Sequence, residues 1–152
     1  MQFEKFTDRA RKVVDLATTE AAQLGDTSVD TVHLLVGMLR EGSGVAGSVL
    51  ASHNIDAEAV LNSCRSFSTD SDVTLPEVES RCLFEAEWLR HNDVGTEHLI
   101  LAVCSFSDCW AASVLADIGT PPHEVCPDVL NLLGHEQNYE QWLADQPEDD
   151  RP

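Results

Sequence analysis

The chain has 152 residues, of which 43% are hydrophobic, which is enough for one compact domain with a buried core and too little for two ordinary ones. Nine basic side chains stand against 27 acidic ones, so the formal net charge is −18 at pH 7. A surface of this sign repels nucleic-acid backbones and anionic membranes, and we expect neither as a partner. Basic peptides, guanidinium groups and cations are compatible with it, although acidity alone most often serves solubility.

The cysteines and the amino terminus indicate the compartment. Five cysteines occur, an odd number without a CxxC pair: Cys64, Cys82, Cys104, Cys109 and Cys126. This pattern predicts reduced thiols, with Cys82 and Cys104 on apolar stripes as ordinary core residues. The opening MQFEKFTDRARKVV has no apolar stretch of signal-peptide length, and no segment approaches the roughly 20 apolar residues that span a bilayer. We therefore expect a cytoplasmic protein.

The sequence repeats itself. A shift of 65 positions superposes two halves without a gap, so that Thr31 and His33 fall on Thr96 and His98, and GSVLA at 47–51 meets ASVLA at 112–116. A coincidence of this length is improbable. We predict repeat one at about 3–65, a polar linker at 66–72 rich in Ser and Asp, and repeat two at about 73–134.

Repeat one is predicted to form four helices. Between Phe6 and Leu24 apolar residues recur at steps of three and four, which is typical of a long helix with one buried face, and Thr7 is placed to cap it. A second helix is expected at about 32–39, a third at about 44–52, and a fourth from Asp56, whose side chain can cap its first turn.

Repeat two copies this pattern and a tail follows it. Thr74 and Glu77 are placed to form a capping box for its first helix, and Gly134 is placed to end its fourth. In the acidic segment 135–152, Tyr139, Trp142 and Leu143 have the spacing of a short amphipathic helix, before an end that we expect to be disordered. No window alternates with period two, so we predict an all-α fold.

Three segments resemble the amino-terminal, or Clp repeat, domain of ClpC-type Hsp100 unfoldases. They are FEKFTDRARKVVDLA at 3–17, VHLLVGMLREGSGVAGSVL at 32–50 and VGTEHLILAV at 94–103. The resemblance covers about residues 3–134 and implies two four-helix repeats related by a pseudo-twofold axis, in a domain 1–134 that receives adaptors and substrates. A Walker A loop is absent, since Lys5 and Lys12 are the only lysines and neither follows a glycine, so we expect no ATP hydrolysis and no cofactor.

The resemblance also implies a binding site. In some members the glutamate of each GTEH segment holds the guanidinium of a phosphorylated arginine, and helix-start amides with a hydroxyl receive the phosphate. The candidate residues are Thr96, Glu97 and His98 in repeat two, with Asp30, Thr31, Val32 and His33 as a weaker counterpart that lacks the glutamate. Asp30 and Glu97 also have a simpler role, because acidic residues at a helix start stabilise the helix without a ligand.

The equivalence of His33 and His98 raises a metal or catalytic interpretation. We expect instead that each histidine hydrogen-bonds across the repeat interface. A structural zinc site needs close pairs such as CxxC or HxxxH, and the sequence has neither; nor has it a GxSxG elbow or a cysteine-protease signature. We therefore predict no metal and no enzyme.

Two functions remain. The first is a protein that binds peptides, substrates or adaptors, as an adaptor or decoy for a Clp unfoldase. The alternative is a regulatory module that binds one dedicated partner through its acidic surface and its carboxyl-terminal segment, independently of proteolysis. Trp88, Tyr139 and Trp142 are the candidate partner-binding residues, with burial of Trp88 against the tail as the plainer interpretation.

Overall fold

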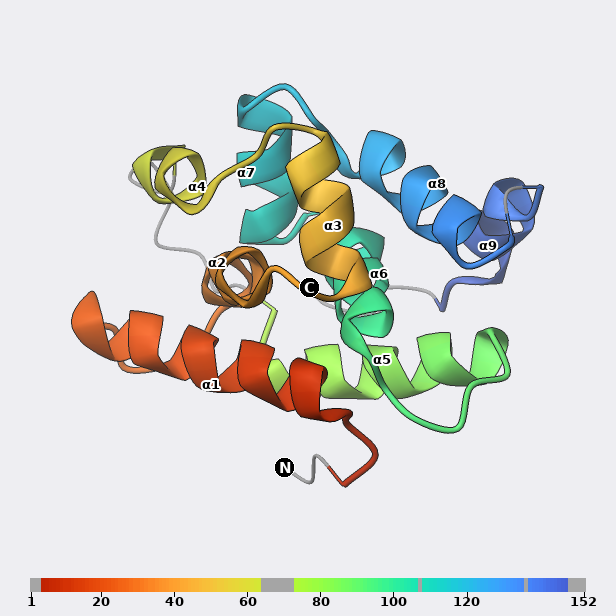
Figure 1. Cartoon of the computed structure of the whole chain (residues 1–152), viewed down its shortest axis with the longest axis horizontal. Coiled ribbons are helices and arrows are strands. Elements are labelled where there is room, and N and C mark those ends of the chain that lie inside the picture. Colours follow the sequence, from red (N-terminus) through yellow and green to blue (C-terminus); the bar gives the residue numbers. More distant parts are fainter. Residues whose placement is uncertain (1–3, 64–72, 107, 136, 148–152) are drawn as a thin grey trace.

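The computed structural model describes residues 4–63, 73–106, 108–135 and 137–147, which form nine helices (Figure 1). Repeat one supplies α1 (Asp8–Gln23), α2 (Thr31–Glu41), α3 (Val45–Ser52) and α4 (Ala57–Ser63); repeat two supplies α5 (Leu75–Trp88), α6 (Thr96–Ser105), α7 (Trp110–Asp117) and α8 (Pro122–Leu132); α9 (Tyr139–Asp145) follows. Strand-like pairing in the described ranges is limited to one isolated parallel bridge between Phe6 and Val94, so the all-α prediction is confirmed. The predicted linker 66–72 and the end of the tail lie outside the described residues.

The helix boundaries follow from the predicted capping residues. The Ala10 N–H donates to the Thr7 hydroxyl at 3.2 Å, and the Ala59 N–H donates to Asp56 Oδ1 at 2.8 Å. Gly134 lies just beyond α8 with φ +81°, in the left-handed region that favours glycine. These three sequence-based boundaries are confirmed.

The third helix of each repeat packs on the other repeat. In Figure 1, α1 and α5 lie along one side of the molecule and α3 and α7 lie opposite them, beyond α2 and α6. The helix α3 contacts α6 and α8, and α7 in turn contacts α2 and α4. One hydrophobic core therefore runs through both repeats, and Trp142 of the tail belongs to it as well.

The core helices are short. Taken alone, none of the described helices is both long and apolar enough to cross a membrane, and the bent pairs α2 with α3 and α6 with α7 reach that length only in combination. Cys82, Cys104, Cys109 and Cys126 are buried, as expected for core residues.

Substituting Gly37 tests the close packing of α1 and α2. A Cβ atom at Gly37 would lie 2.5 Å from the Val13 carbonyl oxygen, a backbone atom that cannot turn away. We expect Gly37→Ala to lower the free energy of unfolding by about 1–3 kcal/mol, measured by urea denaturation. The exposed Ser48→Ala on α3 is the control and should change stability by less than about 0.5 kcal/mol. Equal stability of both variants would contradict the close approach.

Candidate functional site

A cavity of about 320 Å³ lies where the first turns of α1, α3 and α6 meet. It is lined by Thr7, Asp8 and Arg9 of α1, Gly44 and Val45 of α3, and Gly95, Thr96 and Glu97 of α6. Helix starts carry partial positive charge and N–H groups without intrahelical partners, so they favour anions, and Arg9 adds a full positive charge. Glu97 supplies a negative charge beside them. The cavity therefore offers groups for a cation and for an anion side by side.

Thr96 joins the two repeats at the wall of this cavity. Its hydroxyl accepts a hydrogen bond from the Ala46 N–H of α3 at 3.3 Å. A Cβ atom at Gly44 would clash with that hydroxyl, so glycine is what lets the start of α3 approach α6. The equivalent Thr31 hydroxyl accepts from the Ala111 N–H of α7 at 2.9 Å. Both threonines are thus structural residues, and Thr96 also lines the cavity.

Glu97 is held half-buried against Gly95. Its carboxylate occupies the space that a Cβ atom at Gly95 would fill, and its side chain is 19% exposed. Burial raises the pKa of Glu97, while the positive charge of His91 and its own backbone N–H act in the opposite direction. A cation bound in the cavity would favour the ionised form of Glu97, which burial disfavours.

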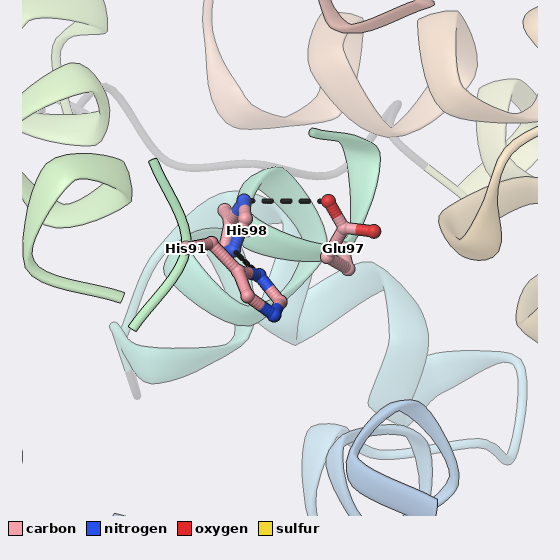
Figure 2. A group of neighbouring side chains, drawn as sticks. All are labelled: His91, Glu97 and His98. Atoms are coloured by element: carbon pink, nitrogen blue, oxygen red, sulfur yellow. Dashed lines mark hydrogen bonds and ion pairs between the residues drawn. The ribbon is translucent and has the colours of Figure 1, made fainter. Parts of the chain in front are cut away.

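The prediction that His33 and His98 hydrogen-bond across the repeat interface is wrong, because both bond within their own repeat. The Gly95 N–H donates to His98 Nδ1 at 2.8 Å, and His98 Nε2 lies 2.8 Å from His91 Nδ1 (Figure 2). In repeat one the Asp30 N–H donates to His33 Nδ1 at 2.9 Å. The His33 ring completes a capping box with Asp30, and the His98 ring accepts the N–H of Gly95, the residue that precedes its own helix. The hydrogen bonds between repeats come from the threonines instead.

Two groups bring metal-binding atoms within 4.8 Å of one another: His91 with Glu97 and His98, and Asp26 with Asp30 and His33. A neutral histidine has one donor nitrogen and one acceptor nitrogen. Since Nδ1 of His98 accepts from a backbone N–H, its Nε2 carries the proton, and it donates to His91 Nδ1 while His91 is neutral. Nε2 of His33 likewise lies 2.8 Å from Asp26 Oδ2. The two buried rings therefore offer no lone pair to a metal ion.

The counterpart in repeat one lacks the same chemistry. Val32, 4% exposed, stands where repeat two has its glutamate. Cys109 and Trp110 stand where the cavity has Gly44 and Val45, so the facing helix start carries larger side chains. Asp30 does not replace the glutamate, because its Oδ1 accepts the His33 N–H at 2.9 Å as the cap of α2. The capping role predicted for Asp30 is confirmed.

The candidate partner-binding residues gather around α9, and none of them lines the cavity at the start of α6. Trp142 is 1% exposed, and its Nε1 donates to Glu85 Oε2 at 2.6 Å. Trp88 is half-buried and donates to Asp145 Oδ2 at 2.9 Å, while the Tyr139 ring stacks on Trp142 with centroids 6.1 Å apart. The tail helix is therefore docked, and Figure 1 places it beside α8.

Sequence reasoning found the α6 half of the cavity and missed the rest. Thr7 was identified only as a cap, and Arg9, Gly44 and Val45 were not identified as site residues. The signal that was present is the opening FTDRA at 6–10, which belongs to the resemblance. The contribution of α3 depends on its packing against the other repeat, which helical periodicity does not report.

Comparison with known proteins gives a consistent result. The family model described as Clp repeat (R) N-terminal domain matches residues 5–80. The chain is 34% identical over 143 residues to the negative regulator of genetic competence ClpC/MecB of Bacillus subtilis (strain 168), across 88% of this chain and 18% of that protein. It is 33% identical over 147 residues to the chaperone protein ClpB of Oceanobacillus iheyensis, across 91% of this chain and 18% of that protein. This chain thus spans less than a fifth of the length of either relative.

Solved structures share the fold. The N-terminal domain of the caseinolytic protease associated chaperone ClpD from Arabidopsis thaliana superposes with a TM-score of 0.74 at 23% identity, covering 88% of this chain and 97% of that one. The Hsp104 N-terminal domain from Candida albicans gives 0.69 at 15% identity, covering 87% and 93%. At these identities the likeness concerns the fold alone, and it confirms the helical architecture.

Acidification is expected to destabilise the protein through His98. Burial, and then the charge of His91, lowers the pKa of His98 to about 4 from 6.5. Between these values the unfolded chain binds a proton that the folded protein does not, so stability falls as the pH falls, by on the order of 3 kcal/mol in total. Urea unfolding at pH 4–7 measures this.

The comparison that isolates the effect is His98→Asn, whose amide oxygen can still accept the Gly95 N–H. The difference in free energy of unfolding between the two proteins should depend on pH only between about 6.5 and 4. A difference that is independent of pH would mean that His98 does not titrate in this way.

Proposed function

Since the chain belongs to the Clp repeat N-terminal domain family, we propose that it is a protein-binding module that recognises peptides, substrates or adaptor proteins. The observation that supports a specific site is the cavity at the start of α6, where Glu97 faces the first turns of α1 and α3. The charge of −18 favours basic or guanidinium-bearing ligands and disfavours nucleic acid and membrane.

The ligand proposed for this cavity is a phosphorylated arginine side chain. The Glu97 carboxylate matches the planar donors of a guanidinium group. A phosphate attached to that guanidinium is accommodated by the first turns of α1 and α3, with Arg9 as a counter-charge. Repeat one lacks the carboxylate at Val32, so the proposal is a single site per chain.

Calorimetric titration with phosphoarginine tests this proposal. We expect the natural chain to bind, and Glu97→Gln to weaken binding by about 10- to 100-fold, because a charge-assisted hydrogen bond contributes about 1.5–3 kcal/mol. The matched control is Asp30→Asn in repeat one, which keeps a capping oxygen and should leave the affinity unchanged. An unaltered affinity in Glu97→Gln, or no binding by the natural chain, would remove phosphoarginine as the ligand.

We further propose a specific role in the cytoplasm, as an adaptor or decoy for a Clp unfoldase. The immobilised protein is expected to enrich Clp components or arginine-phosphorylated proteins from a cytoplasmic lysate. Glu97→Gln should lose the phosphorylated proteins while keeping contacts made elsewhere on the surface. Enrichment of neither group, identified by mass spectrometry, would leave this role without support.

The alternative, a dedicated partner bound through the carboxyl-terminal segment, has a structural requirement. Trp142 is 1% exposed and Trp88 is hydrogen-bonded to Asp145, so both indoles are engaged within the chain. A partner reaches them only when α9 leaves its groove. We therefore keep the cavity at the start of α6 as the proposed site.

A further inference from the structure

Two equivalent buried glutamates have different partners in the two repeats. Glu20, 5% exposed, accepts a hydrogen bond from the guanidinium of Arg40 at 3.3 Å, which ties α1 to α2. Glu85, 0% exposed, stands 65 positions later, and the position matching Arg40 is Ser105. Ser105 accepts a hydrogen bond from Arg81 at 2.6 Å. Repeat two thus has no arginine at position 105, and the cation nearest in role is Arg81 of α5, which bonds Ser105 and whose charge acts on Glu85.

The carboxyl-terminal helix provides the substitute. Trp142 of α9 donates its indole N–H to Glu85 Oε2 at 2.6 Å, whereas Glu85 Oε1 is buried without a hydrogen-bond partner among the described residues. An indole is a neutral donor, so it satisfies one oxygen without supplying a counter-charge. A buried carboxylate held in this way is costly when ionised, and the cost falls when it is protonated.

The helix α9 is short and depends on contacts with the rest of the chain. It has seven residues, too few to be a stable helix without tertiary contacts. Beneath it lies a cavity of about 400 Å³, bordered by Cys104 of α6 and Cys126 of α8 as well as by Tyr139 and Trp142. Beyond the Glu85 bond, Trp88 donates to Asp145 of α9 at 2.9 Å. The short helix is therefore held by the burial of Trp142 in the core, by two indole–carboxylate bonds and by the bond from Arg81 to Gln146.

The ionisation of Glu85 falls near neutral pH. Burial raises its pKa to about 7, and the Trp142 hydrogen bond, the Arg81 charge and the Gln146 side chain oppose this without cancelling it. Cys82 on the same helix and Cys126 on α8 also face this carboxyl. Burial raises the pKa of Cys82, and the contact with Cys104 together with burial raises that of Cys126, so neither thiol carries charge near pH 7.

We propose that α9 is a releasable strap, docked while the Glu85 carboxyl is protonated and released when that carboxyl ionises. Docking encloses Glu85 and so favours its protonated form; by linkage, deprotonation favours the open form. Because the effect of burial exceeds the opposing hydrogen bonds from Trp142 and Gln146, docking is strongest below pH 4.5 and weakens as the pH rises through about 7. Release uncovers the groove between α5, α6 and α8 and frees Trp88, Tyr139 and Trp142 for a partner.

Nuclear magnetic resonance on the full chain tests the strap, by following the indole N–H resonance of Trp142 and the backbone order of α9 from pH 5.5 to 8.5. We expect the hydrogen-bonded indole signal and the order of 139–145 to be lost with a midpoint near pH 7. Glu85→Gln, which mimics the protonated form, should keep α9 docked throughout. Trp142→Phe, which lacks the N–H donor, should release it at lower pH.

The matched control is Glu20→Gln, the same change at the equivalent position, where Arg40 already neutralises the carboxylate. It should leave the midpoint unchanged. His123 borders the cavity beside α9 and the His135 ring lies against Trp88, so a midpoint that persists in Glu85→Gln would assign the transition to a group other than Glu85 and overturn the proposal. An α9 that stays ordered in the natural chain at pH 8.5 would overturn it too.

If the Glu85→Gln variant does not fold, a second measurement on the natural chain tests the proposal. The carboxyl carbon shift of Glu85 in the natural chain reports its protonation directly. Its midpoint must coincide with the midpoint of α9 release. Separate midpoints would show that the two events are uncoupled.

Discussion

Two threonine hydroxyls hold the repeats together, and the remaining structure depends on them. Thr31 accepts the Ala111 N–H at 2.9 Å, and Thr96 accepts the Ala46 N–H at 3.3 Å. Each bond satisfies a first-turn amide of the third helix of the other repeat in the buried interface, where an unpaired N–H costs about 1–3 kcal/mol. Neither repeat can complete its helix starts alone, which is why a single core forms.

The same exchange produces the cavity. Because α3 begins against Thr96, its Gly44 and Val45 come from repeat one while Glu97 comes from repeat two. The other exchange, at Thr31, has the same backbone hydrogen bond but places Cys109 and Trp110 at the facing helix start. The same packing of a third helix against a threonine therefore occurs twice, and only one of the two places has the small side chains and the carboxylate of the proposed binding site.

The sequence predicted the features that depend on residues close to one another along the chain. Helical periodicity reports which face is buried, and the shift of 65 reports the repeat, so caps such as Thr7 and Asp56 could be identified. The partners of His33 and His98 could not be derived, because a histidine in a first helical turn can bond either to its own helix start or to a neighbour. The choice depends on the three-dimensional packing of the helix starts, which no periodicity encodes.

The two repeats also differ in how their buried carboxylates are neutralised. In repeat one the buried glutamate is paired with Arg40, and the place of the second carboxylate is taken by Val32, so no buried carboxylate of this kind is left without a cation. In repeat two, Glu85 and Glu97 are both enclosed, and burial raises the pKa of each. A proton or a cation stabilises such groups, and this is the basis of the proposals made for Glu85 and Glu97. Repeat one thus provides the rigid half of the framework, and the half that can respond to its surroundings is repeat two.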